Sequence, residues 1–168
     1  MRTLTAAVLV LAGCAAPPLP SPVPIQDRVL GGWRGTRTGA DGVSAPVWLL
    51  AYRSVAANVE DIYVHHPDRL YIGRCVVVGG GELPLRLTYA TMQANPDGMG
   101  MSPVREPVVY AGAVADAGLE FGRRSDGGDE FSLTYCWRDD GTWVRTQRRK
   151  PVGADWQVVW TDELRPVR

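Results

Sequence analysis

The strongest constraint on the fold of this chain is a two-residue alternation of apolar and polar side chains, which recurs from about residue 30 onward. In the run LPLRLTYA, the apolar residues Leu83, Leu85, Leu87 and Tyr89 share one side. Successive side chains of a β-strand point to opposite faces, so this run predicts a strand with one buried face. Glycine, proline or aspartate bounds each run, which predicts strands joined by short turns.

Nine alternating runs can be distinguished, and together they predict a mainly β domain. In the run EFSLTYCW, the residues Phe131, Leu133, Tyr135 and Trp137 lie on one side, and Cys136 lies on the other. The predicted strands cover residues 30–38, 47–52, 70–78, 83–90, 107–114, 119–123, 130–137, 142–149 and 156–163.

One short segment departs from the strand pattern. Within and just after residues 54–61, Val55, Val59 and Ile62 are spaced as i, i+4 and i+7, which predicts one short helix. The other connections contain hairpin-type turns such as SDGGDE and RDDGT. A series of antiparallel hairpins predicts an up-and-down barrel or a strongly bent meander of about nine strands, because closure removes exposed strand edges. A two-sheet β-sandwich is the alternative.

The chain begins with an apolar segment that is too short to cross a membrane. Arg2 precedes the run LTAAVLVL at residues 4–11, and two small residues follow it before Cys14. This order of a positive charge, an apolar core and small residues predicts a signal peptide at residues 1–13. A transmembrane helix would need about 20 apolar residues.

The four residues LAGC that end this segment resemble the lipobox of bacterial lipoproteins. The resemblance implies that Cys14 becomes the first residue and carries acyl chains such as palmitate, which anchor the protein in a membrane. Ala15 follows it in place of aspartate, which implies an outer-membrane lipoprotein facing the periplasm or the cell surface. Five of the ten residues at 15–24 are proline, so residues 14–28 are predicted to form an extended linker. A single domain at residues 29–168 follows this linker.

The other two cysteines are Cys75 and Cys136. In an exported protein a remaining pair of cysteines predicts a disulfide bond. On the chain-entropy estimate, such a bond would stabilise the fold by about 4 kcal/mol. Two free, buried thiols are the alternative.

The segment LGGWRGT resembles the first strand of lipocalins and related calycin barrels. Gly31 and Trp33 match the G-x-W motif of these families, and Arg165 is the candidate for the arginine that covers the tryptophan at the closed end of the barrel. The resemblance implies a lipocalin-like barrel that binds a small apolar ligand or an acyl chain. The alternative interpretation of Trp33 is a core tryptophan of an ordinary β protein.

Two further groups of residues are weighed as metal ligands. His65 and His66 are adjacent, so on an extended segment they point to opposite sides, and a solvated turn is the preferred interpretation. Met92, Met99 and Met101 lie in or beside a loop rich in glycine, proline and aspartate. Thioethers suit Cu(I), so Met99 and Met101 are the candidate ligands, but a contact loop is preferred and no metal or other cofactor is predicted.

Charge and motifs limit the remaining functions. The chain has 18 basic and 18 acidic residues, which argues against nucleic-acid binding. It contains no nucleophile motif such as G-x-S-x-G, and its adjacent carboxylates at 60–61 and 139–140 are predicted to lie in turns, so we expect no enzymatic activity. Two functions remain: a domain that binds a small apolar ligand, or a filled barrel that binds another envelope protein as an interaction or assembly factor.

Overall fold

The computed structural model describes residues 28–54, 57–66, 69–80, 83–97, 99–115 and 118–167. The predicted signal peptide, Cys14 and almost all of the linker lie outside these residues. None of the described residues forms a helix that could cross a bilayer. The eleven strands are β1 (Gly31–Gly39), β2 (Ser44–Ser54), β3 (Ala57–His66), β4 (Arg69–Gly80), β5 (Leu83–Ala94), β6 (Met101–Pro103), β7 (Val108–Ala115), β8 (Gly118–Arg124), β9 (Glu130–Trp137), β10 (Trp143–Lys150) and β11 (Gln157–Pro166).

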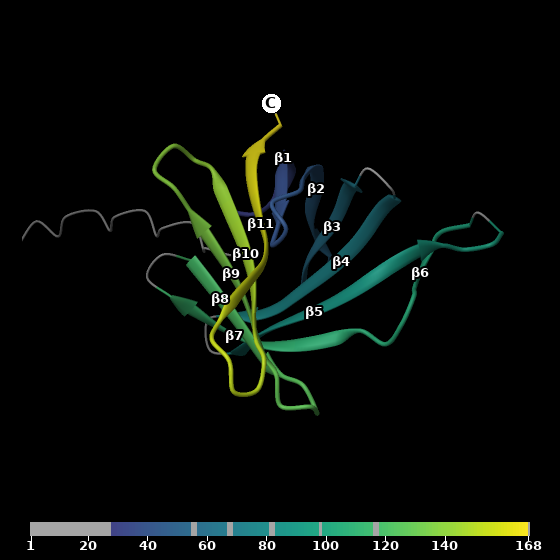
Figure 1. Ribbon diagram of the computed structural model, residues 1–168. Coiled ribbons are helices and arrows are strands. Elements are labelled where there is room, and N and C mark those ends of the chain that lie inside the picture. The colour runs from purple at the N-terminus through teal and green to yellow at the C-terminus, as the bar shows by residue number, and fades with distance from the viewer. Residues whose placement is uncertain are drawn as a thin grey trace, which may run out of the picture.

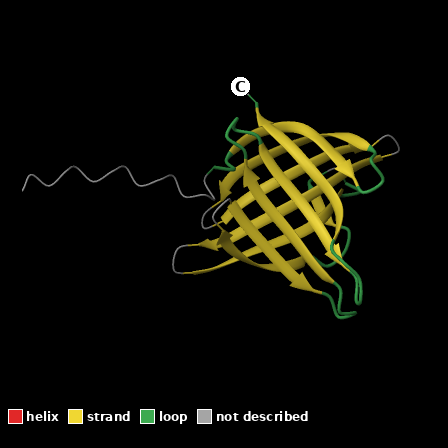
Figure 2. Ribbon diagram, turned by 60° about the vertical axis from the view of Figure 1, so that its left-hand side comes forward, coloured by secondary structure: helices red, strands yellow, loops and turns green. Residues whose placement is uncertain are grey.

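Ten of these strands form a closed antiparallel barrel (Figures 1 and 2). Each strand pairs with the next along the chain, with β5 pairing to β7, and the last strand β11 pairs with β1 to close the wall. The short strand β6 pairs with β5 outside this wall, in a hairpin that projects from the barrel in Figure 1. The predicted up-and-down barrel is therefore confirmed, and the alternative of a two-sheet sandwich is wrong.

The short helix predicted for residues 54–61 is also wrong. Residues 57–66 form β3, which pairs with β2 on one side and with β4 on the other. Val59 and Ile62, which the helical spacing placed together, are both buried, but they lie on opposite faces of the strand. The backbone hydrogen bonds of β3 to β2 and to β4 stabilise the strand more than the helical spacing of three apolar residues stabilises a short helix.

The core consists of the inward-facing side chains of the barrel. Trp143, Tyr135 and Phe121 are fully buried and meet edge to face, with ring centroids 5.3 Å apart in each adjacent pair. Close packing of the wall depends on glycine at several points; at Gly35, for example, a Cβ would lie 1.8 Å from the carbonyl oxygen of Glu163. One half of the barrel is thus filled by large side chains.

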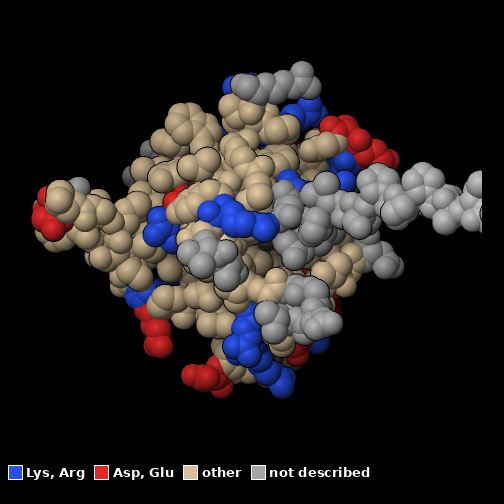
Figure 3. All heavy atoms as spheres, turned by 180° about the vertical axis from the view of Figure 1, so that it is seen from behind, with Lys and Arg blue, Asp and Glu red and all other residues tan. Residues whose placement is uncertain are grey.

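Charged side chains lie mostly on the outside of the barrel. On the face shown in Figure 3, basic and acidic residues are dispersed between wide uncharged areas.

Candidate functional site

The filled end of the barrel contains Trp33, as the G-x-W motif predicts. Its side chain is only 7% exposed, and its indole nitrogen donates a hydrogen bond of 2.7 Å to the carbonyl oxygen of Val29. The ring meets that of Trp143 edge to face, with centroids 5.1 Å apart. Gly31 begins the strand with a φ of 117°, a conformation that favours glycine. The segment before β1 therefore closes this end.

The predicted contact between Trp33 and Arg165 is wrong. Arg165 lies on the outer face of β11, where its side chain is 75% exposed and forms an ion pair of 3.2 Å with Asp140. Side chains alternate along a strand, and the inward positions of β11 belong to Asp162 and Leu164. An arginine does lie over an aromatic ring at this end, but it is Arg28, which is 5.4 Å from the ring centroid of Trp137.

The predicted disulfide is wrong as well, because Cys75 and Cys136 are both free. Cys75 points into the barrel, where its sulfur lies 3.8 Å from Nη2 of Arg145. Cys136 follows the inward-facing Tyr135 and so faces the outside of the wall. The two thiols lie on opposite sides of the sheet, so no rotation of their side chains can join them.

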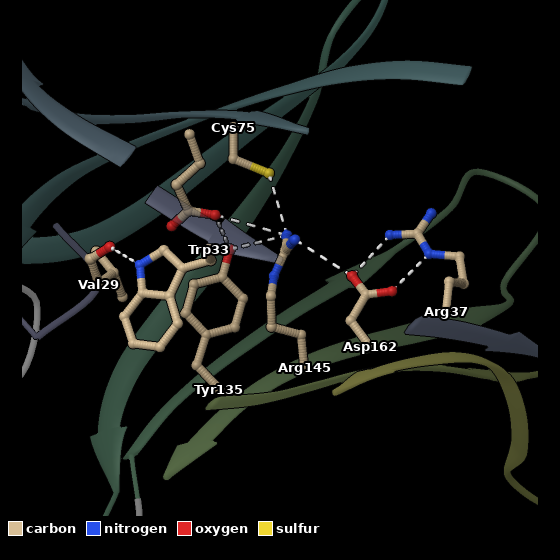
Figure 4. A network of polar contacts seen from close by, with 8 residues as sticks. Val29, Trp33, Arg37, Cys75, Tyr135, Arg145 and Asp162 are labelled. Atoms are coloured by element: carbon tan, nitrogen blue, oxygen red, sulfur yellow. Dashed lines mark hydrogen bonds and ion pairs between the residues drawn. The ribbon is translucent and has the colours of Figure 1, made fainter. Parts of the chain in front are cut away.

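The centre of the barrel holds a buried polar network around Arg145, which is 1% exposed (Figure 4). Its guanidinium lies 3.5 Å from Oε2 of Glu60 and 3.4 Å from Oδ2 of Asp162. Asp162 also accepts two hydrogen bonds from Arg37, at 2.6 and 2.8 Å. Tyr135 donates a hydrogen bond of 2.8 Å to Glu60. The network thus brings two arginines into contact with two carboxyl groups.

Sequence reasoning missed this network. Glu60 was expected in a turn without apolar neighbours, yet it lies in β3 and is completely buried. Burial raises the pKa of its carboxyl group despite the opposing charge of Arg145, and Oε1 has no hydrogen-bond partner among the described residues. Burial, with the nearby carboxyl group of Glu60, also raises the pKa of the Cys75 thiol to about 12. Cys75 is therefore an unreactive thiol at neutral pH.

The other end of the barrel is open. Directly above the polar network lies a small internal cavity of about 30 Å³, bordered by Arg37, Arg145 and Trp160. Beyond it lies an open pocket of about 600 Å³, which we call the mouth basin. Gln147 and Tyr110 border both spaces, and the Gln147 side chain donates a hydrogen bond of 3.4 Å to the Tyr110 hydroxyl group. The basin wall includes Tyr71, Tyr89, Val108, Tyr110, Arg123 and Phe131.

The two candidate histidines contact different aromatic rings. The ring of His65 contacts Trp48 on the outer wall, with centroids 5.2 Å apart, whereas the ring of His66 lies 6.1 Å from that of Tyr71. Met99 is 81% exposed in the turn between β5 and β6, and Met101 is half-buried in β6. In the described part of the chain, no three His, Cys, Asp or Glu residues are grouped so that they could hold a metal ion.

No family model matches this chain, and no curated protein matches it. The fold is therefore described from the arrangement of its strands alone. A closed antiparallel barrel with a tryptophan at the filled end and an aromatic basin at the open end is consistent with a lipocalin-like calycin domain.

Proposed function

We propose that this protein is a membrane-anchored lipoprotein of a bacterial envelope whose barrel binds a small ligand with an apolar body. The observation that carries this proposal is the mouth basin, a concave site of about 600 Å³ lined by four aromatic rings. Ligand sites in proteins are usually concave and mostly apolar, with few polar groups, and the open ends of barrels are common places for them.

The shape of the interior limits the size of this ligand. The cavity below the basin measures about 30 Å³, which is room for about one water molecule. Below it, the buried network around Arg145 and the core ring of Trp143 fill the barrel. A compact ligand that stays in the basin therefore fits better than an extended acyl chain that enters the barrel.

The basin is also oriented suitably for a tethered domain. Arg28 and Val29, which follow the predicted linker, lie at the filled end beside Trp137 and Trp33. The wall strands carry the chain from there to the opposite end, where the basin opens. A lipid anchor at Cys14 would thus join the barrel at the end opposite to the ligand site.

A hollow on the outer wall is a weaker candidate for a ligand site. It measures about 640 Å³ and is bordered by Arg34, Trp48 and Arg165. It lies on the outside of the sheet, and Arg165 is already paired with Asp140. The aromatic residues of the mouth basin, in contrast, surround a single concave space.

Two neighbouring valines on β7 provide the test. Val108 faces the basin, whereas Val109 is exposed on the outer wall. We expect Val108→Trp to abolish the binding of 1-naphthamide to the full-length protein, and Val109→Trp to leave it unchanged. Isothermal titration calorimetry in non-ionic detergent, with empty micelles as the blank, measures this binding. Equal binding by both variants, or no binding by the wild type, would contradict the proposal.

The outer wall of β2 supports the second candidate function, an envelope interaction protein. Trp48 is 58% exposed there, and Leu50 and Tyr52 are exposed beside it on the same face. Exposed apolar groups of this kind often mark protein contacts. Absence of ligand binding, together with photo-crosslinking of an envelope protein from position 48, would favour this function over ligand binding.

A further inference from the structure

The inward-facing arginines of the barrel differ in whether they contact a carboxylate group. Arg37 is held by Asp162 at 2.6 Å, and Arg145 lies between Asp162 and Glu60. A third arginine at the rim, Arg149, donates a hydrogen bond of 2.9 Å from Nε to Asp129. Another inward-facing arginine, Arg123 on β8, has no carboxylate partner and no hydrogen bond among the described residues. Its side chain borders the mouth basin.

Aromatic rings hold this unpaired arginine in place. The guanidinium carbon of Arg123 lies 4.1 Å from the ring centroid of Phe131 and 5.4 Å from that of Tyr110. Such contacts orient the cation over the ring faces but satisfy none of its hydrogen-bond donors. The Nε atom is buried and has no partner within the described chain. A buried donor without a partner is costly, and native proteins rarely retain one.

The other charges of the basin leave Arg123 available for a ligand. Arg105 and Glu106 border the same space and have opposite charges, so Arg123 contributes the excess positive charge. The two deeper arginines, Arg37 and Arg145, each contact a carboxyl group of Asp162 or Glu60. A guanidinium group presents donors in a planar fork that matches a carboxylate group.

We propose that the ligand of the mouth basin is a compact organic anion, with a planar or ring-shaped body and a carboxylate group that binds Arg123. This inference rests on the proposed function and adds the chemical class of the ligand. The rings of Tyr71, Tyr89 and Tyr110 contact the body of the ligand, and Arg123 binds its negative group. The aromatic contacts of the guanidinium keep it oriented before the ligand arrives, which lowers the entropic cost of binding.

Two probes of nearly equal shape test the charge requirement. These probes are 1-naphthoate, which is an anion at neutral pH, and 1-naphthamide, which is neutral. We expect the full-length protein in non-ionic detergent to bind 1-naphthoate more tightly, by about tenfold, since a hydrogen bond to a charged group contributes that much. Arg123→Met should remove this preference and retain the binding of 1-naphthamide.

The matched control is Arg124→Met, because Arg124 is the next residue on β8 and is exposed on the outer face. It should keep the preference for the anion. Equal affinities of the wild type for both probes, or the same preference in both methionine variants, would overturn the inference and leave the proposed function standing. Failure of the Val108→Trp test would instead overturn the proposed function.

If Arg123→Met binds neither 1-naphthoate nor 1-naphthamide, a further variant separates the loss of the charge from damage to the basin. Arg123→Lys keeps the positive charge and most of the side-chain length. Return of the preference for 1-naphthoate in Arg123→Lys would support the inference. No preference in this variant would overturn it.

Discussion

At the scale of single residues, Glu60 makes the clearest contribution to the pH dependence of stability. Burial raises the pKa of its carboxyl group above the ordinary value of 4.5. At a pH between 4.5, the ordinary value, and the raised pKa of the folded state, Glu60 holds a proton in the folded protein that it has released in the unfolded chain. The free energy of unfolding therefore falls as the pH rises through this window, by at most about 1.4 kcal/mol per pH unit.

Glu60→Gln should remove this dependence, because its amide does not titrate. We expect the difference in the free energy of unfolding, wild type minus Glu60→Gln, to fall as the pH rises from about 4.5. Urea denaturation at a series of pH values measures this difference, in which the effects of groups that do not interact with Glu60 cancel. A difference that rises with pH would show that Arg145 keeps Glu60 ionised in the folded state.

At the scale of single elements, β1 is the strand whose side chains define the filled end. We expect Trp33→Ala to lower the free energy of unfolding by about 3 to 5 kcal/mol, because it leaves a cavity beside Trp143 and removes the hydrogen bond to Val29. Arg165→Ala should have the small effect typical of an exposed ion pair. Since the two side chains lie on opposite faces of the wall, their effects should add in the double variant. Urea denaturation of all three variants measures these effects, and clear non-additivity would contradict the observed placement.

The strands were predictable to the extent that their two faces differ. Tyr89 and Tyr135 lie on the inward faces that the alternation assigns to them, because one side of each strand is buried. The same alternation places Cys136 on the outer face of β9, so a disulfide would require Cys75 to face outward as well, whereas Cys75 is completely buried in the interior. Strand β3 was not predictable, because both of its faces carry buried side chains and the pattern of two faces is lost.

At the scale of the whole molecule, the main prediction concerns the anchor. We expect Cys14→Ala to abolish the incorporation of labelled palmitate and to release the protein from the membrane fraction, because the thiol of Cys14 is the predicted site of acylation. Fractionation of cells and metabolic labelling measure both effects. Cys136→Ala is the matched control and should change neither. Membrane association of Cys14→Ala, with no palmitate on the wild type, would contradict the prediction.

The candidate site was less predictable than the fold. The mouth basin combines side chains from β4, β5, β7, β8, β9 and β10, which alternation assigns to the interior without saying which of them meet. The polar network likewise unites Glu60, Tyr135 and Asp162, which are far apart in the sequence. That Arg123 has no partner among the described residues follows only from the positions of all the other carboxylates. Such relations depend on the closed wall and cannot be read from local spacing.

The pairing of β1 with β11 has a consequence for the kinetics of folding. These strands pair residue by residue from Trp33 with Pro166 to Gly39 with Trp160. The wall can therefore close only after β11 has been synthesised and has paired with β1. Folding becomes slower as contacting residues lie further apart in the sequence. We therefore expect the barrel wall to remain open, and folding to be incomplete, until residues 157–166 are available.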